Sequence, residues 1–294
     1  MADILYSPNR ERVITTNAWA FLHWLKTVHD VPLADWTALQ RFSVERPAEF
    51  RAAVSVFARL PDEAVCLARH SGTQEALVFR RADGSRFAFC RDEVRRICGS
   101  PLPPAPSRKG RGRFQTEASP PPLAGGGWGE GVATPIARLW PPAALIRPLA
   151  DLLLHADLRP DDRLLVLGSA WPWLAALLEG TAVILAAPST PTLLALTAEE
   201  RASVLVAPAQ TLGEAAFQRP RHRPDLANLR AIIATGGPLS PEGRRRVYTW
   251  VKADLMLLAR TGDTLWGNPL EPVLARPPAT PALLTPPASD PATP

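Results

Sequence analysis

Five short apolar runs, separated from one another by segments of helical character, constrain the fold of this chain more than any other feature. The runs are LLVLG (164–168), AVILAA (182–187), VLVA (204–207), AIIAT (231–235) and LMLLA (255–259). Continuous apolar runs of this length are typical of strands that are buried on both faces of a sheet. Helices are expected beside and between them, near 143–156, 171–179, 190–201, 208–217 and 240–251. The alternation predicts an α/β fold with a mostly parallel sheet that is covered by helices.

The last of these helices has a clear start signal. Ser240 supplies a capping hydroxyl, Pro241 suits the first helical position, and Glu242 places a negative charge in the first turn. We therefore expect this helix to follow Ser240 directly.

Residues 1–99 are predicted to form an N-terminal helical segment and a β-hairpin. One apolar stripe at three- and four-residue steps marks a helix over 14–28, and its members are Ile14, Ala18, Phe21, Leu22, Leu25 and Val28. Shorter helices are expected around 34–45 and 47–59, and another begins near Asp92. The segment ALVFRRADGSRFAF (76–89) has the pattern of two strands around Asp83-Gly84, which is a strong hairpin signal.

Two segments have too much proline and glycine to support a packed core. Residues 100–142 include PLPPAPSRKGRGRF and SPPPLAGGGWGEG, and residues 269–294 form a proline-rich tail. Both are predicted to be disordered, and the first resembles a translated genomic repeat. The chain therefore divides into 1–99, a disordered insert at 100–142, an α/β region at 143–268 and a disordered tail at 269–294.

The basic net charge of +5 does not indicate a nucleic-acid partner. Only three of the 33 basic residues are lysine, and the abundant arginine, alanine and proline are typical of GC-rich coding. The densest basic run, 108–113, alternates with glycine and lacks interleaved aromatic residues that stack on bases.

Targeting and cysteine signals are equally plain. The sequence has no apolar stretch of eighteen residues, so no membrane partner is expected. Its first residues lack the pattern of a secretory signal. The three cysteines, Cys66, Cys90 and Cys98, have no paired or metal-type spacing, which predicts a reducing cytoplasm.

No motif of nucleophilic or metal catalysis is present. The chain contains no Gly-x-Ser-x-Gly, Cys-x-x-Cys or His-Glu-x-x-His pattern. His23 and His29 are six residues apart, which is too far for a metal pair one helical turn apart. No metal ligand and no catalytic residue is therefore predicted from the residues alone.

Two regions have motifs of a known enzyme family. The first is the N-terminal helical run, where DWTALQRFSVE (35–45) is similar to a family pattern. The second runs from HADLRPDDRLLVLGSAWPW (155–173) to GDTLWGNPLEPV (262–273) and contains a strand, a Gly-Gly-Pro turn, a capped helix, a strand and Gly-x-Thr in family order. Both regions resemble the AMP-forming acid–CoA ligases, and among them the acetoacetyl-CoA synthetases. The resemblance implies part of the large domain of an acyl-adenylate-forming ligase, with ATP or AMP, Mg²⁺ and CoA as ligands, a short acid as substrate, and a cytoplasmic location.

The resemblance also implies which residues face the nucleotide. Gly236, Gly237 and Pro238 match the turn that packs on adenine, and glycines after a parallel strand let a backbone approach a ligand closely. The alternative is an ordinary strand–helix connection. Gly262 and Thr264 match Gly-x-Thr, whose threonine contacts phosphate in the family.

The family's Mg²⁺ carboxylate follows that threonine directly, but this chain has Leu265 there. Asp263 lies two residues early, so it is a candidate substitute only if the loop is rearranged. Trp171 and Trp173 match an aromatic stretch beside the family's acyl pocket, and core packing explains them equally well.

Other family parts have no counterpart in the sequence. LAGGGWGEG, before the helix near 143, lacks the hydroxyls and the lysine of the family's phosphate loop. No lysine follows Lys252, which we expect to complement a helix dipole rather than to serve catalysis. The sequence therefore predicts a fragmentary ligase that is catalytically impaired or inactive. A non-catalytic nucleotide-, acyl- or protein-binding module is the alternative, and residual adenylation through Asp263, with the missing domain on another polypeptide, is a third.

Overall fold

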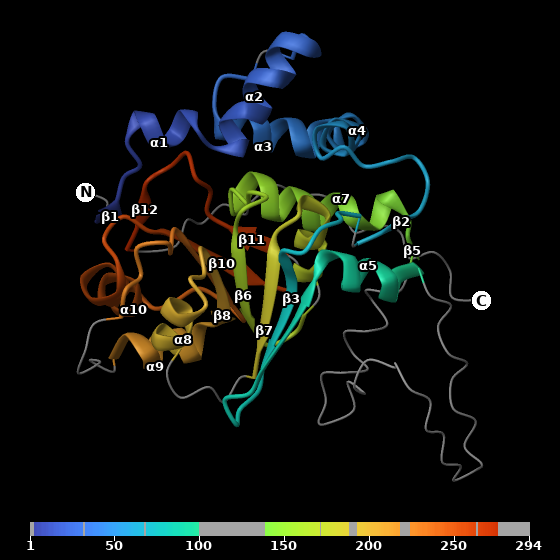
Figure 1. Ribbon diagram of the computed structural model, residues 1–294. Helices are drawn as coiled ribbons and strands as arrows, with labels where there is room; N and C mark the ends of the chain where they lie inside the picture. The colour runs from blue at the N-terminus through green and yellow to red at the C-terminus, as the bar shows by residue number, and fades with distance from the viewer. Residues whose placement is uncertain are drawn as a thin grey trace.

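The computed structural model describes residues 3–31, 33–67, 69–99, 139–170, 172–187, 193–217, 224–262 and 264–275. Within these residues, one eight-stranded sheet has the order β11-β10-β9-β8-β6-β7-β3-β4 (Figure 1). Neighbouring strands from β10 to β3 run parallel, and the two edge strands, β11 and β4, are antiparallel to their neighbours. The predicted α/β fold with a mostly parallel sheet is confirmed. The bounds are β3 Glu75–Arg80, β4 Arg86–Cys90, β6 Arg163–Leu167, β7 Ala182–Ala186, β8 Val204–Pro208, β9 Ala231–Thr235, β10 Met256–Thr261 and β11 Thr264–Trp266.

The five apolar runs form β6 to β10, and each is buried on both faces of the sheet. In β6, Leu164 and Val166 belong to one hydrophobic cluster, whereas Leu165 and Leu167 belong to another on the opposite face. Successive side chains of a strand point to opposite faces, so a strand with two covered faces needs apolar residues at every position.

Helices cover each face as a separate layer (Figure 1). One layer packs on the first cluster and includes α2 (Asn17–Val28), α3 (Trp36–Glu45), α4 (Pro47–Phe57), α7 (Pro142–Ala150), the π-helix η1 (Asp151–His155) and the 3-10 helix η2 (Trp173–Glu179). The other layer packs on the second cluster and includes α8 (Leu193–Glu199), α9 (Ala209–Phe217), α10 (Pro241–Arg246) and the π-helix η3 (Val247–Val251).

The first predicted helix is divided in two. A short helix, α1 (Arg10–Ile14), ends before Thr16, whose hydroxyl accepts a hydrogen bond of 3.2 Å from the Trp19 amide and caps α2. Ile14 and Val28, the two ends of the predicted stripe, are therefore exposed, while the four residues between them are buried. The prediction was wrong at Ile14 because the cap at Thr16 starts a new helix, so Ile14 and the residues of α2 do not share one face. Val28 belongs to α2 but is its last residue.

The remaining helix and hairpin predictions are confirmed. Ser240 caps α10 by accepting a hydrogen bond of 3.1 Å from the Gly243 amide. The hairpin β3–β4 turns at Asp83-Gly84, where Gly84 has a φ of 86°. The helix α5 (Arg91–Gly99) follows β4 directly.

Two small sheets correct the predicted disordered boundaries. The strand β1 (Ile4–Tyr6) pairs with β12 (Val273–Leu274), so residues 269–275 of the predicted tail are ordered. The strand β2 (Val65–Cys66) pairs with β5 (Leu139–Trp140), so the end of the predicted insert is also ordered. Strands this short have no periodicity, and their partners are remote in sequence. Residues 100–138 and 276–294 lie outside the described residues.

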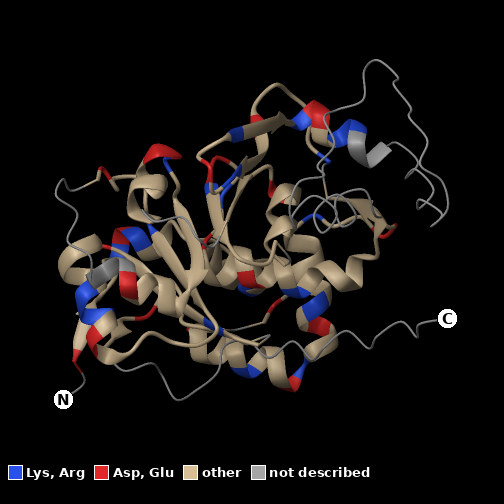
Figure 2. Cartoon of the chain, turned by 90° about the horizontal axis from the view of Figure 1, so that it is seen from below, with Lys and Arg blue, Asp and Glu red and all other residues tan. Residues whose placement is uncertain are grey.

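Cysteine, charge and hydropathy complete the description. Cys66 is disulfide-bonded, which corrects the expectation of no pairing, and Cys90 is a free thiol. In the view of Figure 2, the described basic and acidic residues are scattered over the same helices and strands. No described helix is long and apolar enough to cross a membrane.

Candidate functional site

The strands β9 and β10 end side by side at the carboxyl edge of the sheet. Thr235 pairs with Arg260, and the Gly236-Gly237-Pro238 turn begins immediately after β9. The Gly237 amide donates a hydrogen bond of 3.1 Å to the Arg260 carbonyl, so the turn is fixed to the end of β10. The structure thus brings the predicted glycine turn next to the Gly262 turn that follows β10, at the edge where ligands of parallel sheets collect.

The glycine turn leaves space that a side chain would fill. Gly236 and Gly237 have φ values of 81° and 136°, which L-residues rarely adopt. A Cβ atom built on either residue would meet nothing within 4 Å. Crowding within the chain therefore does not explain these glycines. Their backbone conformation does, and it leaves a bare backbone surface at the carboxyl edge.

The second predicted motif is a tight β-hairpin. Thr261 pairs with Thr264 across the β10–β11 ladder, so Gly262 lies in the turn between the two strands. Gly262 has a φ of 57°, as the first position of a favoured hairpin turn requires. Asp263 lies outside the described residues. Leu265, the residue after Thr264, is 1% exposed and belongs to the first hydrophobic cluster.

Trp173 lies in the core beneath this hairpin rather than on an open pocket wall. Its side chain is buried in the first cluster, and the guanidinium carbon of Arg260 lies 5.2 Å from the centre of its ring. Arg260 Nη1 also donates to Asp151 Oδ2 at 3.2 Å, and its Nε donates to the Gly262 carbonyl at 3.0 Å. Trp171, the other predicted acyl-pocket residue, lies outside the described residues.

Arg260 and Asp151 were not predicted from the sequence, although a signal was present. Arg260 ends the apolar run of β10, and Asp151 interrupts the apolar run that spans α7 and η1. A charged residue inside a run that is otherwise buried needs a partner. That rule finds both residues, but it does not show that they pair with each other.

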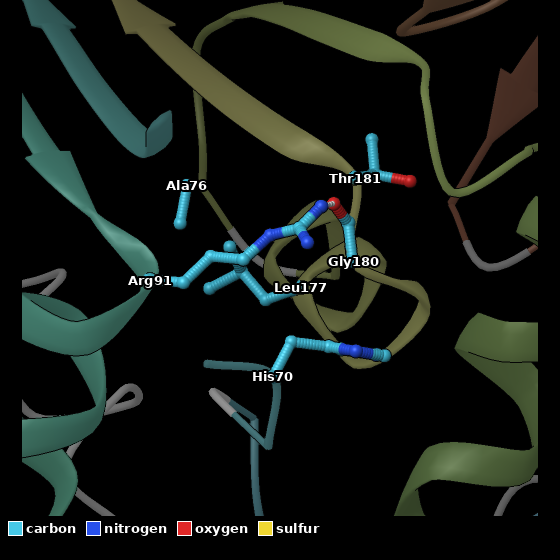
Figure 3. A pocket seen from close by; sticks show the side chains of 6 residues that line it. All are labelled: His70, Ala76, Arg91, Leu177, Gly180 and Thr181. Atoms are coloured by element: carbon cyan, nitrogen blue, oxygen red, sulfur yellow. Dashed lines mark hydrogen bonds between the residues drawn. The ribbon is translucent and has the colours of Figure 1, made fainter. Parts of the chain in front are cut away.

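The opposite end of η2 is held by the side chains of Arg69, His70 and Arg91, of which Figure 3 shows His70 and Arg91. Arg69 Nε and His70 Nε2 contact the Leu178 carbonyl at 2.7 and 2.8 Å, and Arg91 Nη2 donates to the Gly180 carbonyl at 2.6 Å. Donors at the last carbonyls complement the partial negative charge of a helix C-terminus. The cavity between them is about 10 Å³, room for one water molecule. These contacts fix the helix that carries Trp173.

Lys252 lies at the amino end of β9, remote from the glycine turn. Its Nζ donates to the carbonyls of Ala227 and Leu229 at 2.8 and 2.7 Å, and it lies 3.7 Å from Asp254 Oδ1. Lys252 is the C-cap residue of η3, the helix end at which the sequence predicted it, and its ammonium also contacts the loop that leads into β9. A lysine in this place has no access to a ligand at the carboxyl edge.

His155 is completely buried under the segment that follows the hairpin. Its Nδ1–H donates to the Gly267 carbonyl at 2.7 Å, and its ring lies edge-on against Trp36 with centroids 4.8 Å apart. Burial lowers the pKa of His155 to about 4, and the hydrogen bond to Gly267 opposes this only in part. The imidazole is therefore neutral at physiological pH. No group of three metal-ligating side chains occurs among the described residues.

Comparison with solved structures defines the class of this fold. Acetoacetyl-CoA synthetase from Streptomyces lividans superposes with a TM-score of 0.67 and 17% identity, over 92% of this chain and 67% of that chain. The match to the amide bond synthetase McbA from Marinactinospora thermotolerans spans 40% of this chain and 25% of that chain at 18% identity. Its TM-score of 0.34 is too low to indicate a shared fold. The chain therefore has part of the fold of an acyl-adenylate-forming ligase.

Sequence comparison supplies the relationship. Over 148 residues the chain is 32% identical to acetoacetyl-coenzyme A synthetase of Rhizobium meliloti (strain 1021), a match that spans 44% of this chain and 23% of that enzyme. No family model matches the chain. The chain is accordingly a partial relative of the AMP-forming acid–CoA ligases, similar to acetoacetyl-CoA synthetase.

Proposed function

We propose that this chain is an acetoacetyl-CoA synthetase-like fragment that binds adenine nucleotide at the carboxyl edge of its sheet and does not complete acyl-adenylate formation. One observation carries the proposal. The glycine turn after β9 and the glycine hairpin after β10 lie side by side, joined by the bond from the Gly237 amide to the Arg260 carbonyl.

Nucleotide binding is supported by the shape and position of this surface. Backbone without side chains offers a flat contact for a planar base, and three glycines at this edge leave space that a Cβ would otherwise enter: Gly236, Gly237 and Gly262. The carboxyl ends of parallel strands are where α/β sheets bind such ligands. The exposed Pro238 closes the turn before the capped helix α10 begins.

Impaired adenylation is supported by what lies around the hairpin. A Mg²⁺ ion bound to phosphates needs oxygen ligands from the protein. The position where the resemblance places a carboxylate holds Leu265, whose side chain points into the core. Lys252 is engaged with two carbonyls at the far edge of the sheet. Residual adenylation through Asp263, assisted by a separate polypeptide, is the competing hypothesis.

Two assays on the full 294-residue chain separate these functions. We expect saturable AMP binding in a calorimetric titration, together with no ATP–pyrophosphate exchange in the presence of Mg²⁺ and acetoacetate. Pyrophosphate exchange above the level of a protein-free control would contradict the proposal that adenylation is impaired and would favour residual adenylation through Asp263. Absence of AMP and ATP binding at millimolar nucleotide would contradict nucleotide binding and leave the non-catalytic interaction module as the better description.

A matched pair of glycine variants adds specificity to the binding assay. Gly237→Ala introduces a methyl group at the proposed ligand face, at a φ of 136°. Gly84→Ala introduces the same methyl at a φ of 86° in the β3–β4 hairpin, also with nothing within 4 Å. Both variants should be strained, because both glycines have a positive φ. Only Gly237→Ala should weaken AMP binding, because β3 is four strands from β9, about 19 Å at 4.8 Å a strand.

A further inference from the structure

We infer that the outer edge of β4 is the pairing surface of a homodimer, in which two copies of this chain join their sheets through antiparallel β4 strands. The strand β4 (Arg86–Cys90) ends the main sheet opposite β11, and no described strand other than β3 pairs with it. The inference goes beyond the proposed function and does not depend on it, because β4 lies five strands from β9.

The hydrogen-bond pattern of the hairpin shows which backbone groups of β4 face outward. The Arg81 amide donates to the Ser85 carbonyl at 3.0 Å, so these opposite residues form a hydrogen-bonded pair. Bonded and non-bonded pairs alternate along an antiparallel ladder, and this alternation puts Arg86 and Ala88 at non-bonded positions with respect to β3. Their amides and carbonyls therefore point away from β3, toward the open edge.

The strand lacks two of the features that keep sheet edges from pairing. Natural edge strands are protected by proline and by free charges, among other features, and the sequence RFAFC contains no proline. Its one charged residue, Arg86, is paired with Glu75 Oε2 at 2.8 Å and with Glu200 Oε1 at 3.0 Å. The amide of Cys90, at the end of the strand, donates to Glu93 Oε2 at 2.7 Å. The middle of the strand is thus left open to another strand.

The sequence of β4 is complementary to itself. When two β4 strands pair antiparallel with Ala88 at the centre, two hydrogen bonds form between the Ala88 residues, and each Arg86 amide meets the Cys90 carbonyl of the other copy. The same register puts Phe87 opposite Phe89 of the second copy, on one face of the joined sheet. Phe87 is 38% exposed, and Phe89 packs partly buried on the first hydrophobic cluster. Cross-strand aromatic pairs stabilise sheets, so the pairing covers the exposed ring.

A second copy is therefore the partner that this edge fits. Two-fold pairing uses the β4 edge of both copies, so the assembly closes at the dimer. Two five-residue strands make a small interface, since a standard interface has roughly 20–30 residues on each side. We therefore expect a dimer that dissociates on dilution, with the surface after β9 open in both copies.

The test is sedimentation velocity of the full 294-residue chain, from micromolar to several hundred micromolar protein. Ala88→Pro removes the central outward amide without removing a bond to β3, and proline is tolerated in edge strands at such positions. Phe87→Lys places a charge in the aromatic pair, and its exposed position keeps it informative if the proline variant does not fold. Val56→Lys is the matched control, because Val56 is 61% exposed on α4 and the charge change is the same. Circular dichroism checks that each variant is folded.

The wild type and Val56→Lys should show an average mass that rises with concentration toward twice the monomer mass, while Ala88→Pro and Phe87→Lys stay monomeric. A wild type that stays monomeric throughout overturns the inference and shows that the edge is not free to pair. Dimers that persist in the folded β4 variants, or that are lost equally in Val56→Lys, overturn the assignment to β4. Species larger than a dimer contradict the closed two-fold pairing.

Discussion

His155 makes the stability of this chain depend on pH in a way that can be measured against the structure. The imidazole is completely buried at the junction of η1, α3 and the segment after β11. Its pKa is lowered from 6.5 to about 4, chiefly because burial removes water from the charged form. The folded protein therefore keeps His155 neutral under conditions in which the unfolded chain binds a proton.

The sign and the size follow from proton linkage. A folded-state pKa below the unfolded one means that stability is complete above pH 6.5 and falls as the pH decreases toward 4. Each pH unit between these values contributes about 1.4 kcal/mol, so the full effect is about 3 kcal/mol. Between pH 7 and pH 5, the free energy of unfolding should fall by about 2 kcal/mol through this one residue.

The assay is urea denaturation at pH 8, 7, 6 and 5, followed by circular dichroism, on the wild type and on His155→Asn. Asparagine retains an N–H near the position of Nδ1 but does not titrate, so the variant loses packing by an amount that does not depend on pH. The stability gap between the wild type and the variant should therefore narrow by about 2 kcal/mol from pH 7 to pH 5. Other titrating groups cancel in this difference. His23→Asn, which removes an exposed histidine of α2, is the matched control.

A gap that stays constant from pH 8 to pH 5 would refute the reasoning, because it would show that His155 titrates alike in the folded and unfolded states. A gap that widens toward low pH would contradict the sign, since it would mean that the folded protein stabilises the imidazolium.

Three further substitutions test the packing around the sheet by urea denaturation. Asp157→Ala should lower the free energy of unfolding by about 3–5 kcal/mol, because it removes one carboxylate partner of Arg230 and the acceptor of the Asn17 amide. The control Asp161→Ala, at an exposed position, should cost little. Equal losses in the two variants would contradict a stabilising role for the contacts of Asp157. Gly267→Ala should cost about 1–3 kcal/mol, because its Cβ would lie 2.9 Å from Leu258 Cδ2 at a φ of 95°; a neutral result would show that the turn is looser than described. Ser240→Ala should cost about 1 kcal/mol through loss of the α10 cap, and Ser240→Asn should restore it.

The parts of the fold that the sequence predicted are those with strong local signals. The runs that became β6 to β10 have only one favourable environment, a strand with both faces covered. Ser240 and Asp83-Gly84 predicted their cap and turn through chemistry confined to a few residues.

The parts that the sequence missed depend on remote partners. The pairing of β1 with β12 joins segments about 270 residues apart, and each strand is too short to have a period. The segment after Gly267 is rich in proline, and that composition predicts disorder. It does not predict that Val273 packs on the second hydrophobic cluster and so stabilises an ordered segment.

The candidate site shows the same division. The resemblance placed both glycine turns, and the structure brings them together through the pairing of β9 with β10. The arginine and aspartate beside them were missed because only the tertiary fold brings η1 next to β10. Trp173 was described as either a pocket or a core residue, and its burial in the first cluster favours the core.

Hydrogen–deuterium exchange of the full chain with and without AMP tests the central claim most directly, because it locates the ligand without any substitution. Bound nucleotide should slow exchange in the amides of 235–237 and 260–264, the two turns that meet at the carboxyl edge. The β1–β12 pair, which the proposed site does not include, should be unchanged. Protection of the two turns together is the predicted result. AMP-dependent protection elsewhere, or none at either turn under saturating AMP, would contradict it.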